Sequence, residues 1–111
     1  MKHSTPNPTK AQQKRFEALQ EMGCICCRIE GLGINPPQIH HLVEGRKRLG
    51  HDFTIPLCPW HHEGYPHHGI SESSMLYHYG PSLARNKRKF IETYGTEREL
   101  LEKVNENLKE E

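Results

Sequence analysis

Residues 54–62 read TIPLCPWHH and contain the most informative pattern in the sequence. Thr54–Leu57 predicts a short strand, and Cys58–Glu63 predicts the opening turn of a helix. Cys58 and His61 form a C-x-x-H pair, and a C-x-x-C pair lies about 30 residues earlier in CICC, residues 24–27. A two-residue spacing lets both ligands of a pair reach one ion from a tight turn, and two such pairs complete the tetrahedron that zinc prefers. We therefore predict a closed, structural zinc site formed by Cys24, Cys27, Cys58 and His61.

Cys26 is the spare thiol of this motif, because a C-x-C or vicinal pair holds an ion less comfortably. Two alternatives stay open. One is a reduced, buried cysteine cluster without metal. The other is a redox motif of thioredoxin type, which the absence of a long βαβ pattern disfavours.

The composition explains why a small chain needs such a staple. The 111 residues suit one compact domain, yet 33% are hydrophobic and 7% aromatic, so the apolar core is thin. A fold of this size relies on disulfides, a metal or a partner chain. Four cysteines and nine histidines make metal the first hypothesis, and zinc would supply folding free energy that the core cannot.

Neither a membrane span nor an export signal is expected. No apolar run approaches the roughly 20 residues of a span, and the start of the chain, MKHSTPNPTKAQQKR, lacks the apolar core of a signal peptide. We expect a cytoplasmic protein whose thiols are reduced. The net charge of +1 hides an uneven distribution, because residues 1–95 hold 12 Lys+Arg against 8 Asp+Glu and residues 96–111 hold 3 against 6. An acidic tail masks a basic body.

Capping and turn residues divide the chain into a disordered or loosely docked arm at residues 1–8 and a single domain at residues 9–111. Thr9 and Gln12 form a capping box that opens a first helix ending at Gly23, and Thr96 and Glu99 form another that opens a last helix to about residue 109. Between them we predict irregular structure at 24–37, strands at 38–43 and 54–57 joined by a loop, a helical turn at 58–63, a loop or short irregular helix at 64–80, and a helix from Pro81 to Gly95. The predicted fold is small α+β, with an N-terminal helix and two C-terminal helices around the strands.

Several histidines remain after the zinc ligands are assigned. His40 and His41 are neighbours on the first strand, where successive side chains diverge, so one can bind a metal while the other serves as a base. The other candidates nearby are Asp52, His62, His67 and His68. Gathered about one divalent ion with open positions, such residues support metal-assisted phosphodiester hydrolysis. For any single histidine, the alternative is a surface position or a hydrogen bond in the core.

The combined string resembles a known family of nucleases. Its parts are GCICCR, IHHLVEGRKRLGHDFTIPLCPWHH, YGPSLARNKRKF and YGTERELLEKV, which cover roughly residues 20–105. The C-x-x-C, the IHH on a strand and DFTIPLCPWHH resemble the HNH branch of the His-Me finger nucleases. The whole string resembles the phage and prophage recombination-enhancement (Ref-type) RecA-dependent nucleases. The resemblance implies a zinc-stapled ββα-metal core and a DNA endonuclease that uses a catalytic divalent metal (Mg²⁺, Mn²⁺ or Zn²⁺). Such an enzyme leaves 5′-phosphate ends where a RecA filament has invaded a duplex.

The same resemblance implies roles for individual residues. His41 matches the general base and His40 the metal ligand beside it. Asp52 matches the middle residue of the motif, usually Asn, which orients the base. His62 matches the first ligand on the helix. For the last ligand we favour His68 over His67 and the more remote His78.

Two clusters of cations are candidates for phosphate contacts. Arg46, Lys47 and Arg48 lie between two glycines, and we predict that this flexible loop binds DNA. The cations at residues 85–89 are more typical of an ordinary solvated helix face than of a DNA contact. No pattern in the sequence indicates base-specific readout. Two other hypotheses compete with the nuclease: a zinc-stapled module that binds DNA or a recombinase without cutting, and a composite zinc store. A histidine base beside a metal ligand favours the nuclease.

Overall fold

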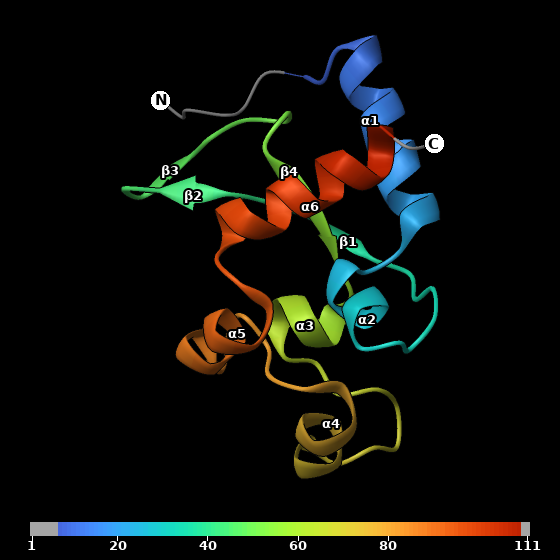
Figure 1. Ribbon diagram of the computed structural model, residues 1–111, viewed down its shortest axis with the longest axis vertical. Helices are drawn as coiled ribbons and strands as arrows, with labels where there is room; N and C mark the ends of the chain where they lie inside the picture. Colours follow the sequence, from blue (N-terminus) through green and yellow to red (C-terminus); the bar gives the residue numbers. More distant parts are fainter. Residues whose placement is uncertain (1–6, 110–111) are drawn as a thin grey trace.

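The computed structural model describes residues 7–109 as a small α+β protein of six helices and four short strands. The elements are α1 (Lys10–Met22), α2 (Ile25–Ile29), β1 (Gln38–His41), β2 (Val43–Glu44), β3 (Lys47–Arg48), β4 (Thr54–Leu57), α3 (Pro59–Glu63), α4 (Glu72–Tyr79), α5 (Lys87–Tyr94) and α6 (Glu97–Lys109) (Figure 1). Most of the predicted arm, residues 1–6, lies outside the described residues. Between residues 7 and 109, no helix is both long and apolar enough to cross a membrane.

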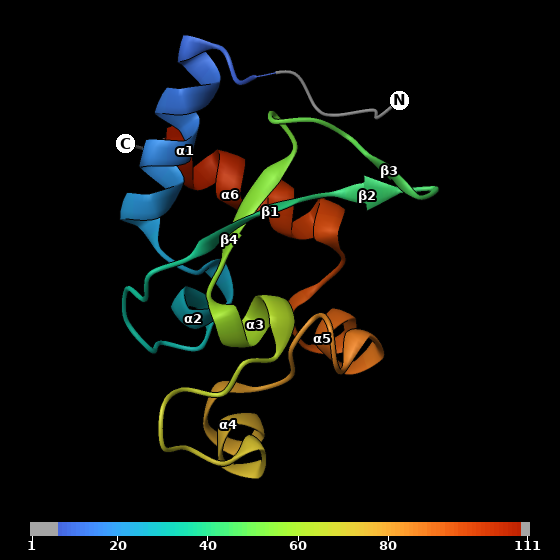
Figure 2. The same cartoon turned by 180° about the vertical axis from the view of Figure 1, so that it is seen from behind.

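Strands β1 and β4 form the central antiparallel pair, with His40 opposite Ile55 and His41 opposite Thr54. Helix α3 follows β4 directly, because Cys58 caps its first turn and Pro59 occupies its first position. Helix α6 lies across one face of the strand pair and α1 lies beside it (Figures 1 and 2). The buried apolar side chains form one cluster, and its largest members include Leu19, Met22, Ile55, Leu57, Trp60, Phe90, Leu100 and Val104.

A second strand pair, β2–β3, replaces part of the predicted first strand and loop. Buried Leu42 interrupts the first strand: its N–H donates to the Phe53 carbonyl at 2.9 Å, and its carbonyl accepts from Leu49 N at 3.0 Å. The two-residue turn that follows has positive φ at Gly45 (58°) and Arg46 (69°). This left-handed pair suits the tight hairpin turn whose twist matches its strands. The hairpin projects from the body of the protein (Figures 1 and 2).

Arg15 of α1 connects three elements around the strand pair. Its guanidinium donates to Thr54 Oγ1 at 2.9 Å and to the Thr54 carbonyl at 2.6 Å, and also to Asn105 Oδ1 of α6 at 2.9 Å. Thr54 is fully buried and its hydroxyl donates to the His51 carbonyl at 3.0 Å. This network fixes the start of β4 relative to both flanking helices.

The helix predicted from Pro81 to Gly95 is wrong in its first half, because α5 begins only at Lys87. Residues 81–86 form a turn instead: Ser82 N–H donates to Asn86 Oδ1 at 3.2 Å, and Leu83 N–H donates to the His61 carbonyl at 2.8 Å. The first bond closes the turn, and the second holds it against α3. The preceding segment contains α4, which Ser71 caps.

The segment predicted to be irregular, residues 24–37, also contains a short helix, α2. Both capping boxes predicted for the outer helices are present, with Thr9 and Gln12 at α1 and Thr96 and Glu99 at α6.

Candidate functional site

The two cysteine-containing pairs are built in the same way, each at the start of a short helix. Cys24 caps α2, and its sulfur accepts from Cys27 N–H at 3.5 Å. Cys58 caps α3, and its sulfur accepts from His61 N–H at 3.5 Å. In each of the two helices, the side chains of the capping residue and of the third helical residue therefore point in the same direction. This local geometry explains why a two-residue spacing gives two convergent side chains.

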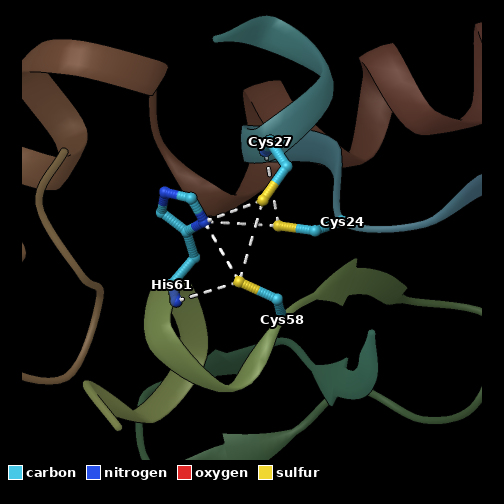
Figure 3. Close-up of side chains that lie close together, drawn as sticks. All are labelled: Cys24, Cys27, Cys58 and His61. Atoms are coloured by element: carbon cyan, nitrogen blue, oxygen red, sulfur yellow. Dashed lines mark hydrogen bonds between the residues drawn. The ribbon is translucent and has the colours of Figure 1, made fainter. Parts of the chain in front are cut away.

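These two helix starts face each other and bring four ligand atoms to within 4.8 Å of one another (Figure 3). His61 Nδ1 lies 3.4, 3.5 and 3.3 Å from the sulfurs of Cys24, Cys27 and Cys58. The sulfurs of Cys27 and Cys58 are 3.8 Å apart. A tetrahedral zinc ion with ordinary bond lengths requires sulfurs about 3.8 Å apart and nitrogen about 3.5 Å from each sulfur. The buried Cys₃His group therefore fits zinc, and the structure brings together the four residues that the spacing selects.

The other nitrogen of His61 is held by groups that the sequence does not identify. His61 Nε2 lies 2.8 Å from the Tyr79 carbonyl, and the Tyr94 hydroxyl lies 2.8 Å from the same oxygen. The Tyr94 hydroxyl also lies 2.7 Å from Glu30 Oε2. A carbonyl can only accept, so it favours the N–H on Nε2 and leaves the lone pair of Nδ1 directed at the sulfurs.

The surroundings of His61 raise the pKa of its ring. Burial lowers the pKa of His61, but hydrogen bonds to Cys24 and Cys58 raise it more, to about 10. Burial raises the pKa of Cys26, which lies outside the set of four ligands. The sulfurs of Cys24 and Cys58 therefore favour the charged form of the His61 ring.

A second cluster joins β1, α3 and α6. His40 Nδ1 lies 3.1 Å from His62 Nε2, so one nitrogen of each ring faces the other ring. Of the two remaining nitrogens, His40 Nε2 lies 2.8 Å from Glu97 Oε1, and His62 Nδ1 lies 2.7 Å from Gln38 Oε1. Burial lowers the pKa of His62, and the neighbouring charge of His40 lowers it further. The structure therefore brings together His40 and His62, as predicted, and adds two residues that the sequence motifs missed.

His41 points to a different set of neighbours. Its Nε2 lies 3.0 Å from His51 Nδ1, and the ring of Phe16 lies edge-on at 6.3 Å between centroids. Burial lowers the pKa of His41 to about 4, assisted by the charges of Arg48, His51 and His40. At neutral pH the ring is uncharged and one of its nitrogens can accept a proton.

The structure does not bring Asp52 to His41. The Asp52 side chain is exposed, and its Oδ2 accepts from Gln12 Nε2 at 3.1 Å. Thr54 occupies the register position opposite His41 and holds the backbone of His51, so His51 rather than Asp52 is turned towards the ring.

The structure also does not join the late histidines to His40 and His62. His68 is exposed in the segment between α3 and α4, and the ring of His67 packs against Tyr79 at 4.7 Å. His78 is exposed on α4 and contacts Tyr77. Within residues 7–109, no second group of three such ligand atoms lies within 4.8 Å.

The basic segment predicted to be a flexible loop is an ordered hairpin. Arg46, Lys47 and Arg48 are exposed on it. Glu44 on the same hairpin accepts from Arg98 of α6 at 2.6 and 3.2 Å, and Arg98 lies over the Phe53 ring at 5.5 Å. The hairpin is therefore tied to the start of α6, next to Glu97.

Known protein families provide an independent comparison. Residues 8–109 match the family described as recombination enhancement, RecA-dependent nuclease. The match extends from before α1 to the end of α6, so it includes both clusters. The family's description implies nuclease chemistry linked to recombination, with DNA as the substrate and RecA involved. The chain belongs to the family of recombination-enhancement, RecA-dependent nucleases.

Proposed function

We propose that this protein is a divalent-metal-dependent DNA endonuclease of the HNH type, acting where a RecA filament engages a duplex. The observation that carries the proposal is that two adjacent histidines of β1 contact different partners. His40 faces His62 at 3.1 Å, while the adjacent His41 faces His51 at 3.0 Å. Strand β1 thus supplies one of the two facing ligand nitrogens, opposite His62 of α3, and beside it a neutral histidine. A domain that only binds DNA has no need of this combination.

His40 and His62 fit a divalent ion by their chemistry. Imidazole nitrogens are common ligands for zinc and several other divalent ions, and the two facing nitrogens are separated as two ligands on one ion would be. As the only two protein ligands, His40 and His62 would hold the ion with room for water and a phosphate oxygen, and a bound ion would stabilise charge on the phosphate and the leaving oxygen. The Cys₃His group, with four protein ligands, is the structural zinc site of the proposal.

His41 is the general base of the proposed reaction. Its neutral ring takes a proton from the attacking water, whose oxygen then bonds to phosphorus as the bond to the 3′ oxygen breaks. This cleavage leaves a 5′-phosphate. When His41 Nε2 donates to His51 Nδ1, the lone pair of His41 Nδ1 stays available for the proton. His51 therefore takes the orienting role that the family resemblance implied for Asp52.

The β2–β3 hairpin is the proposed DNA contact. It presents Arg46, Lys47 and Arg48 to solvent and continues directly from the strand that carries His41. Cations on an ordered hairpin position phosphates without reading bases, which supports cleavage that tolerates many sequences.

The test is a cleavage assay with purified protein on duplex, nicked and single-stranded DNA and on RecA-coated joint molecules, with Mg²⁺, Mn²⁺ or Zn²⁺. We expect metal-dependent cleavage that increases with the RecA filament, and a loss of about 100-fold or more in His41→Ala. His78→Ala, an exposed histidine on α4, is the matched control and should cut like the wild type. Equal cleavage by His41→Ala would rule out the assigned base. Filament binding without cleavage by the wild type, under every metal, would favour the non-catalytic binding module.

A further inference from the structure

In the pair of His40 and His62, a side-chain oxygen contacts the outer nitrogen of each ring, which is the nitrogen that faces away from the other histidine. Glu97 Oε1 contacts the outer nitrogen of His40 at 2.8 Å, and Gln38 Oε1 contacts the outer nitrogen of His62 at 2.7 Å. Both contacts are short for nitrogen–oxygen hydrogen bonds. The side chains of His40 and Glu97 are 14% and 21% exposed, so this contact is shielded from much of the solvent.

Each of these oxygens dictates where the proton of its imidazole lies. An ionised carboxylate and an amide oxygen only accept, so the ring nitrogen that faces them must carry the N–H. A neutral imidazole has one N–H, and its other nitrogen is then an acceptor. The inner nitrogens, His40 Nδ1 and His62 Nε2, are consequently both acceptors, and they face each other at 3.1 Å. Two lone pairs at this distance repel unless a cation lies between them.

We infer that Glu97 is a positioning residue for a cation held by His40 and His62, and that Gln38 has the same task for His62. The inference rests on the proposed function, because it concerns the ion that the two histidines hold there. Glu97 touches the nitrogen on the far side of the ring from His62, so it acts through His40 and not as a third ligand. Glu97 fixes the tautomer of His40, and its negative charge makes the inner nitrogen of His40 a stronger ligand for the ion.

The position of Glu97 at the start of α6 explains why its carboxylate is held beside His40. It is the first residue of α6, and the capping box of Thr96 and Glu99 fixes this turn. The next residue, Arg98, binds Glu44 of the hairpin. The start of α6 therefore holds both the metal-ligand histidine and the hairpin that continues from its strand.

The test measures the tautomer of His40 and the affinity for Zn²⁺, independently of cleavage. The protein is first loaded with one equivalent of zinc, and Zn²⁺ is then titrated by calorimetry into the wild type, Glu97→Ala, Glu97→Gln and the control Glu106→Ala, which removes an exposed carboxylate on the same helix. We expect Glu97→Ala to weaken the second ion by about 10- to 100-fold. Glu97→Gln keeps an acceptor oxygen but loses the charge, so its affinity should lie between those of the wild type and Glu97→Ala, and Glu106→Ala should match the wild type.

Nitrogen-15 NMR of the histidine rings supplies the second readout. We expect the N–H of His40 on Nε2 in the wild type and in Glu97→Gln, and a mixture of tautomers in Glu97→Ala. A merely structural role for Glu97 would lower the melting temperature without this pattern. His40→Ala separates the failures. If it weakens the second ion while Glu97→Ala changes neither affinity nor tautomer, the inference is wrong and the proposed metal site stands. If His40→Ala binds a second ion like the wild type, the proposed site is wrong and the inference falls with it.

Discussion

The Cys₃His group and the His40–His62 pair share helix α3 but differ in completeness. The first is fully buried, and its four ligand atoms surround one point. The second is only partly buried and presents two ring nitrogens to each other. Neighbouring residues of α3, His61 and His62, turn towards the two different clusters. A single helical turn thus contributes one residue to a closed group of four ligands and the next residue to an open pair of histidines.

This contrast also shows what each cluster depends on. The closed group is made by local helix caps at Cys24 and Cys58, whereas the open pair is held by side chains from β1 and the start of α6. Damage to the first should abolish the fold, and damage to the second should abolish the function alone.

The largest effect is expected from Cys58→Ser. Serine still caps α3, so the change removes a zinc ligand while sparing the cap. Structural zinc contributes about 10–16 kcal/mol in zinc-finger peptides, which exceeds the stability of most small domains. We expect loss of zinc and unfolding by circular dichroism. Cys26→Ala is the matched control on a buried thiol outside the set, and it should stay folded with zinc bound. A folded, zinc-free Cys58→Ser protein would show that the group is not the staple.

Graded removal of metal should separate the two clusters in the wild type. We expect the proposed two-ligand site to lose its ion to a mild chelator, because open coordination binds less tightly than four buried ligands. We expect cleavage to disappear first, with circular dichroism unchanged and activity restored by added metal. Unfolding should follow only with a strong chelator. Simultaneous loss of activity and fold would contradict the division.

A smaller effect is expected from His51→Ala. Without the contact to His41 Nε2, the proposed base would lose its orientation, and cleavage should fall about tenfold or more while the fold remains. Asp52→Asn is the neighbouring control. Because Asp52 is exposed and contacts Gln12, its change should alter the rate by no more than about twofold. The reverse ranking would return the orienting role to Asp52.

The smallest effect is expected from Lys47→Gln on the hairpin. Loss of one phosphate contact should reduce the salt dependence of DNA affinity by about 0.9 in log–log slope. Lys89→Gln, on the exposed side of α5, should leave the slope unchanged. Equal slopes for both variants and the wild type would remove the hairpin from the DNA interface.

The extent to which the sequence predicts these clusters depends on how many positions separate their members along the chain. Cys24 with Cys27, and Cys58 with His61, are local pairs whose spacing matches the start of a helix, so the ligand set could be selected from spacing alone. The capping boxes of α1 and α6 are equally local, and both were predicted correctly.

Glu97 and His51 were missed as partners because long-range packing sets their contacts. Glu97 meets His40 across 57 positions, and it sits in a first turn where acidic residues are common for helix stability alone. His51 lies ten positions from His41, and only the hairpin turn at Gly45 and Arg46 brings it back. The start of α5 was misplaced because Pro81 suits a first helical position, whereas the backbone of Leu83 bonds to His61 instead.

The most direct test of two separate sites is the metal count of His62→Ala by native mass spectrometry after loading with Zn²⁺. We predict two ions in the wild type and one in His62→Ala, with the variant folded as the wild type. Two ions in the variant, or loss of both ions together with the fold, would contradict the claim that His61 and His62 serve different sites.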